Sequence, residues 1–121
     1  DIYILGATGT RMDHTITNIG NMKVVADCGK DCHIVDEHNY IYLLSEADGI
    51  HIIRKDSQYG RYVSIIPMSE NVSLSLEGFK YTLDNYELKQ GLSICQSNEV
   101  EDEQGIIKVH KGLIIVLETK D

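Results

Sequence analysis

The spacing of hydrophobic and polar residues along the chain changes character near Gly29. Residues 1–5 form a short apolar run, and residues 6–9 form a turn rich in small residues. From about residue 11 to residue 28, apolar side chains recur at helical spacing, and Gly29 is a natural stop. The beginning of the chain therefore predicts a strand, a turn and one helix. The residues expected on one face of this helix are Met12, Ile16, Ile19 and Ala26.

Short strand-like runs follow at close spacing after Gly29. The clearest is 72–77, where apolar and polar residues alternate, as expected for a strand with one face in water. Pro67 ends a run instead of interrupting one. The predicted strands are 33–35, 40–45, 50–54, 62–66, 72–77, 92–95, 105–109 and 113–117.

Turn signals between these runs indicate how the strands connect. Asp48-Gly49 and Lys111-Gly112 each lie between two apolar runs and predict hairpins. Many short strands with turns between them are typical of an antiparallel sandwich or barrel. We therefore predict a mostly β fold, an antiparallel β-sandwich preceded by a strand-helix remnant of an α/β nucleotide-binding domain. Because the run at 1–5 has no neighbour to pair with before it, we expect the native protein to continue upstream.

Composition excludes several classes of partner. The net charge of −8 opposes binding to nucleic-acid phosphates and to anionic membranes, but it is compatible with carboxylates that hold Mg²⁺. The longest apolar stretch, 113–117, is far too short to cross a bilayer. The cysteines, Cys28, Cys32 and Cys95, are odd in number and form no regular framework, which indicates free thiols in a reducing compartment, the cytoplasm.

Candidate chemistry begins at the turn between the first strand and the helix. A glycine turn before a helix exposes backbone N–H groups to a phosphate, and Arg11 adds a guanidinium suited to phosphate oxygens. Asp13 is able to coordinate Mg²⁺. The segment matches neither a dinucleotide-binding fingerprint nor a P-loop. On the residues alone, Asp13 as a partner of the helix dipole and Arg11 as a surface residue stay equally open.

The order of residues over the whole chain resembles a known family. Gly9-Thr-Arg-Met-Asp-His14 resembles the Gly-Gly-Arg-Leu-Asp-His motif of bacterial thiamine pyrophosphokinases, and a helix of the family's His-Thr-x-x-Asn-Ile type follows. Segments 36–41, 62–67, 76–83 and 91–99 are similar to family segments in the same order. Thr10 stands where the family usually has a second glycine. If that position needs a positive φ, a β-branched Thr fits it poorly, and this departure bears on the loop's role in nucleotide contact.

This resemblance implies a two-domain subunit in a homodimer, with active sites in the cleft between subunits. Residues 1–30 would be the last strand and helix of the α/β domain that binds Mg²⁺–ATP, and residues 31–121 would be the thiamine-binding β-sandwich. The implied reaction is attack of the thiamine hydroxyl on the β-phosphorus of ATP, which yields thiamine diphosphate and AMP. Since the aspartate-rich segment of the family lies upstream, we expect little activity from this chain alone.

The resemblance also assigns roles to single residues. It implies that Arg11 clamps phosphate, that Gly9 lets the backbone approach the nucleotide, and that Asp13 binds Mg²⁺ and takes part in catalysis. Ser97 and Asn98 would hydrogen-bond the thiamine pyrimidine, although a Ser-Asn turn between strands has the same sequence.

Other readings of the chain stay open. Tyr81 and Tyr86 are interpreted as half-buried sandwich residues in preference to stacking platforms. The acidic run 99–103 is interpreted as a solvated loop or an attractor of the thiazolium ring. The competing functions are a non-catalytic β-sandwich binding or regulatory module, and a structural interaction domain.

Overall fold

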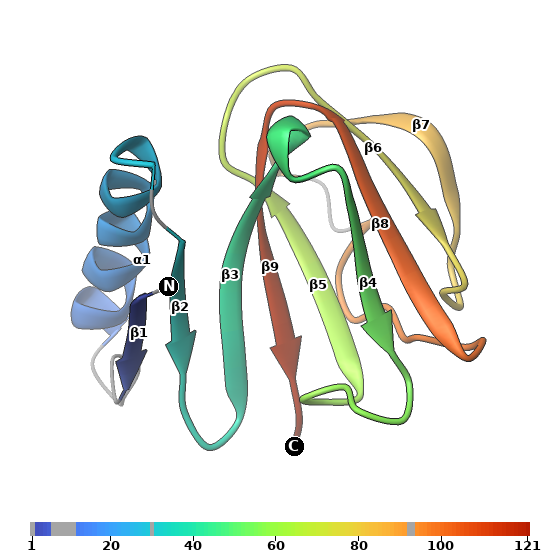
Figure 1. The fold of residues 1–121 in the computed structure, drawn as a ribbon, viewed down its shortest axis with the longest axis horizontal. Helices are drawn as coiled ribbons and strands as arrows, with labels where there is room; N and C mark the ends of the chain where they lie inside the picture. Colours follow the sequence, from blue (N-terminus) through green and yellow to red (C-terminus); the bar gives the residue numbers. More distant parts are fainter. Residues whose placement is uncertain (1, 6–11, 30, 92–93) are drawn as a thin grey trace.

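A computed structural model describes residues 2–5, 12–29, 31–91 and 94–121 (Figure 1). Within these residues the strands form a five-stranded sheet of order β1-β2-β3-β9-β5 and a four-stranded sheet of order β4-β8-β6-β7. The elements are β1 (Ile2–Leu5), α1 (Met12–Asp27), β2 (Cys32–Val35), β3 (Asn39–Ser45), the 3₁₀ turn η1 (Glu46–Asp48), β4 (Ile50–Arg54), β5 (Tyr62–Pro67), β6 (Val72–Glu77), β7 (Leu83–Leu88), β8 (Gln104–Lys111) and β9 (Leu113–Thr119). The prediction of a mostly β fold is confirmed.

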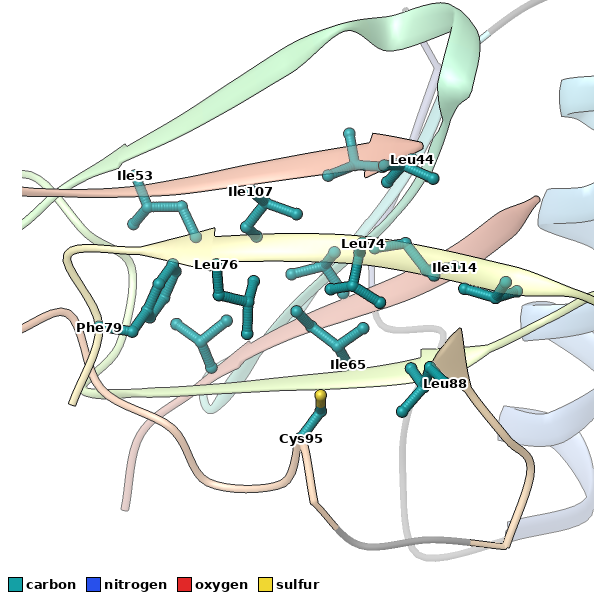
Figure 2. Close-up of a cluster of buried hydrophobic side chains, with 14 of the residues drawn as sticks. Leu44, Ile53, Ile65, Leu74, Leu76, Phe79, Leu88, Cys95, Ile107 and Ile114 are labelled. Atoms are coloured by element: carbon teal, nitrogen blue, oxygen red, sulfur yellow. The ribbon is translucent and has the colours of Figure 1, made fainter. Parts of the chain in front are cut away.

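Two hydrophobic cores hold the helix and the two sheets together. The larger core lies between the two sheets, and Figure 2 shows side chains such as Ile65, Leu74 and Ile107 pointing into it. The smaller core lies between α1 and the five-stranded sheet, around Met22 and Ile34. Successive side chains point to opposite faces of a strand, so β6 alternates buried apolar and more exposed polar residues. In β9, which lies between the two cores, Ile114 and Val116 enter the larger core and Ile115 the smaller one.

β1, at the beginning of the chain, is an edge strand of the five-stranded sheet of the sandwich. β1 pairs in parallel with β2, whereas the other strand pairs of the described residues are antiparallel. A parallel pair connected through a helix is the unit from which α/β domains are built. The predicted division between residues 30 and 31 falls inside this unit and stays a prediction.

The buried face of α1 differs from the predicted one. Met22 is fully buried and Ile19 packs beside it, but Ile16 is 62% exposed. With 3.6 residues per turn, Ile16 lies about 120° around the helix from Met22, so both cannot face the sheet. The prediction was wrong for Ile16 because the fully buried Met22 sets the face that α1 turns towards the sheet.

One predicted strand is absent from the described residues, and one observed strand was not predicted. In the predicted strand 92–95, the described residues Ile94 and Cys95 lie in a turn. The strand that completes the sheet is β7, whose sequence Leu-Asp-Asn-Tyr-Glu-Leu is mostly polar and was not predicted. β7 is an edge strand, and such strands tolerate polar residues because one side of their backbone faces water.

Neither predicted hairpin is observed: each of the two turns connects strands of different sheets. β3 belongs to the five-stranded sheet and β4 to the other, so the turn at Asp48-Gly49 carries the chain across the sandwich. The turn at Lys111-Gly112 does the same between β8 and β9. The Asp-Gly and Lys-Gly pairs predict where the chain turns. Which strands pair with each other depends on how the two sheets pack.

Candidate functional site

The predicted phosphate-binding residues are described only in part. Gly9 and Arg11 lie outside the described residues. Asp13 lies in the first turn of α1, is exposed, and accepts a hydrogen bond from the His14 N–H at 3.0 Å. A carboxylate in this position is compatible with both predicted roles, as a magnesium ligand and as a partner of the helix dipole.

Asn98 lies in the connection between β7 and β8 and is buried, with 3% of its surface exposed. Its Oδ1 accepts hydrogen bonds from the backbone N–H groups of Tyr81, at 3.0 Å, and Glu99, at 2.9 Å. Its Nδ2 donates to the Tyr81 carbonyl oxygen at 2.8 Å. The carboxamide is therefore largely occupied by the protein's own backbone.

Ser97 differs from its neighbour in both exposure and contacts. It is exposed and adopts a left-handed backbone conformation with φ of 54°, and its N–H donates to the Ser64 hydroxyl at 2.9 Å. Within the described residues, the Ser97 hydroxyl makes no hydrogen bond, so it is available to a ligand.

A pocket of about 530 Å³ opens beside Asn98. Its wall is largely apolar, with Tyr81 57% exposed and Ile94 45% exposed. A concave, mostly apolar surface with a few fixed polar groups is typical of sites for small organic molecules. The lining residues are Leu76, Lys80, Tyr81, Thr82, Leu83, Ile94, Gln96 and Asn98; Ser97 is not among them.

Tyr81 lines this pocket, although the sequence favoured a half-buried sandwich residue over a stacking platform at this position. It was interpreted as half-buried, whereas its ring is mostly exposed. Tyr86, on β7, is partly buried against the sandwich core, as predicted. Because β7 was not recognised from its polar sequence, nothing in the pattern indicated that Tyr81 comes just before a strand and outside the core.

The acidic run after Asn98 begins with a paired carboxylate. Glu99 Oε1 accepts from the Arg61 guanidinium at 2.8 Å, and this hydrogen bond holds the pKa of Glu99 below its usual value. Lys80 and Lys55 add a smaller effect in the same direction. Glu99 is thus part of an ion pair, and Lys80 is the one formally charged residue among those lining the pocket.

A separate polar cluster lies between the two sheets. The Tyr42 hydroxyl donates to Oε2 of the buried Glu118 at 2.6 Å and lies 2.9 Å from His51 Nε2. Because the hydroxyl hydrogen goes to Glu118, the oxygen accepts from the imidazole, which assigns the Nε2–H tautomer to His51. Burial lowers the pKa of His51, which favours the neutral imidazole, and burial raises the pKa of Glu118.

Within the described part of the chain, no group of three or more His, Cys, Asp or Glu side chains is arranged to hold a metal ion. Cys32 and Cys95 are buried in different cores, and Cys28 is exposed on α1's C-terminal side. Burial raises the pKa of the Cys95 thiol to about 11. The helix of the described residues is not long and apolar enough to cross a membrane.

Sequence comparisons connect this pocket to a known domain. The family model described as "Thiamin pyrophosphokinase, vitamin B1 binding domain" matches residues 50–114, which is more than half of the chain and includes every residue lining the pocket. The thiamine pyrophosphokinase of Bacillus subtilis (strain 168) is 35% identical over 121 residues, covering 99% of this chain and 55% of that protein. Thiamine pyrophosphokinase 1 of Oryza sativa subsp. japonica is 33% identical, covering 93% of this chain and 42% of that protein.

Solved structures agree with the sequence comparisons. The crystal structure of the Bacillus subtilis enzyme superposes with a TM-score of 0.90 at 35% identity, covering 99% of this chain and 55% of that one. That of the Geobacillus thermodenitrificans enzyme gives 0.85 at 32% identity, covering 99% and 54%. The chain spans about half the length of these relatives. It belongs to the thiamine pyrophosphokinase family and contains the family's vitamin B1-binding domain.

Proposed function

We propose that the pocket beside Asn98 receives thiamine, with Asn98 in its wall and the Ser97 hydroxyl as the predicted hydrogen-bonding partner. The observation that carries this proposal is that the whole lining lies within the matched vitamin B1-binding domain. Thiamine has a neutral, flat aminopyrimidine ring, which requires apolar or aromatic surface on its faces and hydrogen-bonding groups at its edge. The exposed Tyr81 side chain supplies the first kind of contact. Ser97 lies between the lining residues Gln96 and Asn98, and its hydroxyl would supply the second.

The charge of the pocket favours one end of the vitamin. Lys80 is the charged lining residue, and its Nζ lies 5.7 Å from the centre of the Tyr81 ring, where it makes a cation–π contact. A thiazolium cation at the same place would be repelled by this ammonium group. The neutral pyrimidine is therefore the end that we place in the pocket.

For the whole protein we propose the transfer of diphosphate from ATP to thiamine, which yields thiamine diphosphate and AMP. Such a transfer depends on in-line positioning and on stabilising charge on the phosphate oxygens, and Mg²⁺, when bound, supplies part of that charge. Arg11 would contact phosphate, Gly9 would let the backbone approach it, and Asp13 would hold the metal. The exposed carboxylate of Asp13 fits this role, because Mg²⁺ is usually held by one or two carboxylates together with substrate phosphates.

A homodimer in the cytoplasm completes the proposal. The family resemblance supports a homodimer whose active sites lie between subunits. The free thiols of Cys28, Cys32 and Cys95 support a reducing compartment. The proposed partners are the small molecules thiamine and ATP, and the net charge of −8 opposes nucleic acid and anionic membranes.

The competing proposal is a β-sandwich that binds thiamine without catalysis. It is favoured by one observation: the family model that matches this chain, over residues 50–114, is that of a vitamin B1 binding domain. We expect AMP release that depends on both thiamine and Mg²⁺ when the complete reading frame containing this chain is expressed and supplied with ATP. Thiamine binding without AMP release would support the binding module.

The pocket itself is tested by Tyr81→Ala. We expect the affinity of this chain for thiamine, measured by isothermal titration calorimetry, to fall about tenfold, because an aromatic contact and its buried area are lost. Tyr3→Ala is the matched control, since Tyr3 on β1 is 56% exposed and Tyr81 57% exposed. Equal thiamine affinities in both variants, or no binding by the unchanged chain, would contradict the proposed pocket.

A further inference from the structure

The side chain of Asn98 acts as a strand partner for the segment that carries Tyr81. Gly78 and Lys80 pair through their backbones with the chain after Asn98: the Glu101 N–H donates to the Gly78 carbonyl at 2.8 Å, and the Lys80 N–H donates to the Glu99 carbonyl at 2.8 Å. Between them, Phe79 and Val100 form an isolated antiparallel bridge. These contacts make a short ladder that leads towards the pocket.

The ladder continues at Tyr81 through a side chain instead of a backbone. Both the N–H and the carbonyl of Tyr81 bond to the Asn98 carboxamide, at 3.0 and 2.8 Å. The backbone of Asn98 is itself fixed to Val63 by hydrogen bonds of 2.8 and 2.9 Å. One side chain, whose backbone is bonded to β5, thus holds both polar backbone groups of Tyr81, a residue that is 57% exposed and lines the pocket.

We propose that Asn98 is a positioning residue that acts on the ligand through Tyr81. Three of the four hydrogen-bonding positions of its carboxamide are used within the protein: Oδ1 accepts twice and Nδ2 donates once. The direction of the Tyr81 side chain follows from its backbone, which these bonds fix. The predicted effect on ligand binding rests on the proposed thiamine pocket. The hydrogen bonds between Asn98 and the Tyr81 backbone can be tested without any ligand.

The ligand-free test measures hydrogen exchange of the Tyr81 amide by NMR. We expect Asn98→Ala to speed this exchange about tenfold or more, because the acceptor of the Tyr81 N–H is removed. Amides of the buried residues Ile107 and Val116 report global stability in the same spectrum. If Asn98→Ala does not fold, Asn98→Leu serves instead, since its side chain is close to Asn in size but offers no acceptor to the Tyr81 N–H. Unchanged exchange at Tyr81 would overturn the proposal.

The ligand test is a double-mutant cycle with thiamine as the probe. Asn98→Asp replaces the donor to the Tyr81 carbonyl with an oxygen. It is expected to weaken thiamine binding about tenfold in the wild-type background and less than about twofold in the Tyr81→Ala background. Equal losses in both backgrounds would mean that Asn98 contacts the ligand directly, and would overturn a role through Tyr81. If the unchanged chain binds no thiamine, the proposed function fails, and the exchange experiment still decides whether Asn98 holds Tyr81.

Discussion

Tyr42→Phe is expected to lower the free energy of unfolding by about 3 kcal/mol, because it leaves a buried carboxylate without its closest donor. Glu118 is 4% exposed, and its other hydrogen bond in the described residues comes from the Tyr59 N–H at 3.4 Å. The substitution also removes the acceptor of the His51 imidazole. Urea unfolding near neutral pH measures this loss directly.

Two further variants separate the effect of leaving the Glu118 carboxylate unpaired from the general effect of removing a tyrosine hydroxyl. Tyr86→Phe is the matched control: Tyr86 is partly buried against the core, and its hydroxyl makes no hydrogen bond in the described residues, so a loss below about 0.5 kcal/mol is expected. In a Glu118→Leu background, Tyr42→Phe should cost much less than in the unchanged chain, because no buried carboxylate is left unpaired. Equal costs in both backgrounds would show that the carboxylate is not the cause.

The cost of Tyr42→Phe should also depend on pH, in a defined direction. Burial raises the pKa of Glu118, and the Tyr42 hydrogen bond opposes this rise. Removal of the hydroxyl therefore raises the folded-state pKa further. A group whose folded-state pKa is raised contributes most stability below its unfolded-state pKa and loses it as the pH rises. The difference between Tyr42→Phe and the unchanged chain should thus shrink as the pH falls towards about 4.3, the ordinary value for glutamate.

Gly78→Ala is expected to destabilise the chain by about 4 kcal/mol, or to abolish cooperative unfolding. Gly78 has φ of 76°, and a Cβ added there would lie 2.1 Å from the Gln104 carbonyl oxygen. The backbone is not free to move away, because the Gly78 carbonyl accepts hydrogen bonds from the N–H groups of Glu101 and Asp102. Conformational strain and a backbone clash therefore add at one position.

Gly29→Ala is the control for the conformational part of this effect. Gly29 also has a positive φ, of 79°, but an added Cβ would meet no atom within 4 Å. Its expected cost is about 1 kcal/mol, the strain of a left-handed alanine alone. Chemical denaturation monitored by circular dichroism compares the two variants. Similar losses at both positions would show that the chain around Gln104 adjusts, and that the close approach at Gly78 is unimportant.

The segments with regular alternation were predictable, and those with mixed composition were not. Val72–Glu77 was predicted with its observed bounds because its apolar and polar residues alternate strictly. β7 was missed because its interior residues are polar, and its place at the sheet edge is decided by pairing with β6. At the site, the resemblance drew attention to Asn98, but no pattern indicated the exposed ring of Tyr81 or the hydrogen bonds between the two residues.

What the sequence by itself determined was the kind and position of most elements, the end of the helix at Gly29, and the family to which the chain belongs. These follow from local spacing and residue order, because the period of a helix or strand is a property of neighbouring residues. The tertiary structure alone decided which sheet each strand enters, how Asn98 holds Tyr81, and that Tyr42 meets Glu118 from 76 positions away. Such contacts depend on how whole layers pack, and packing joins residues whose separation along the chain carries no periodic signal.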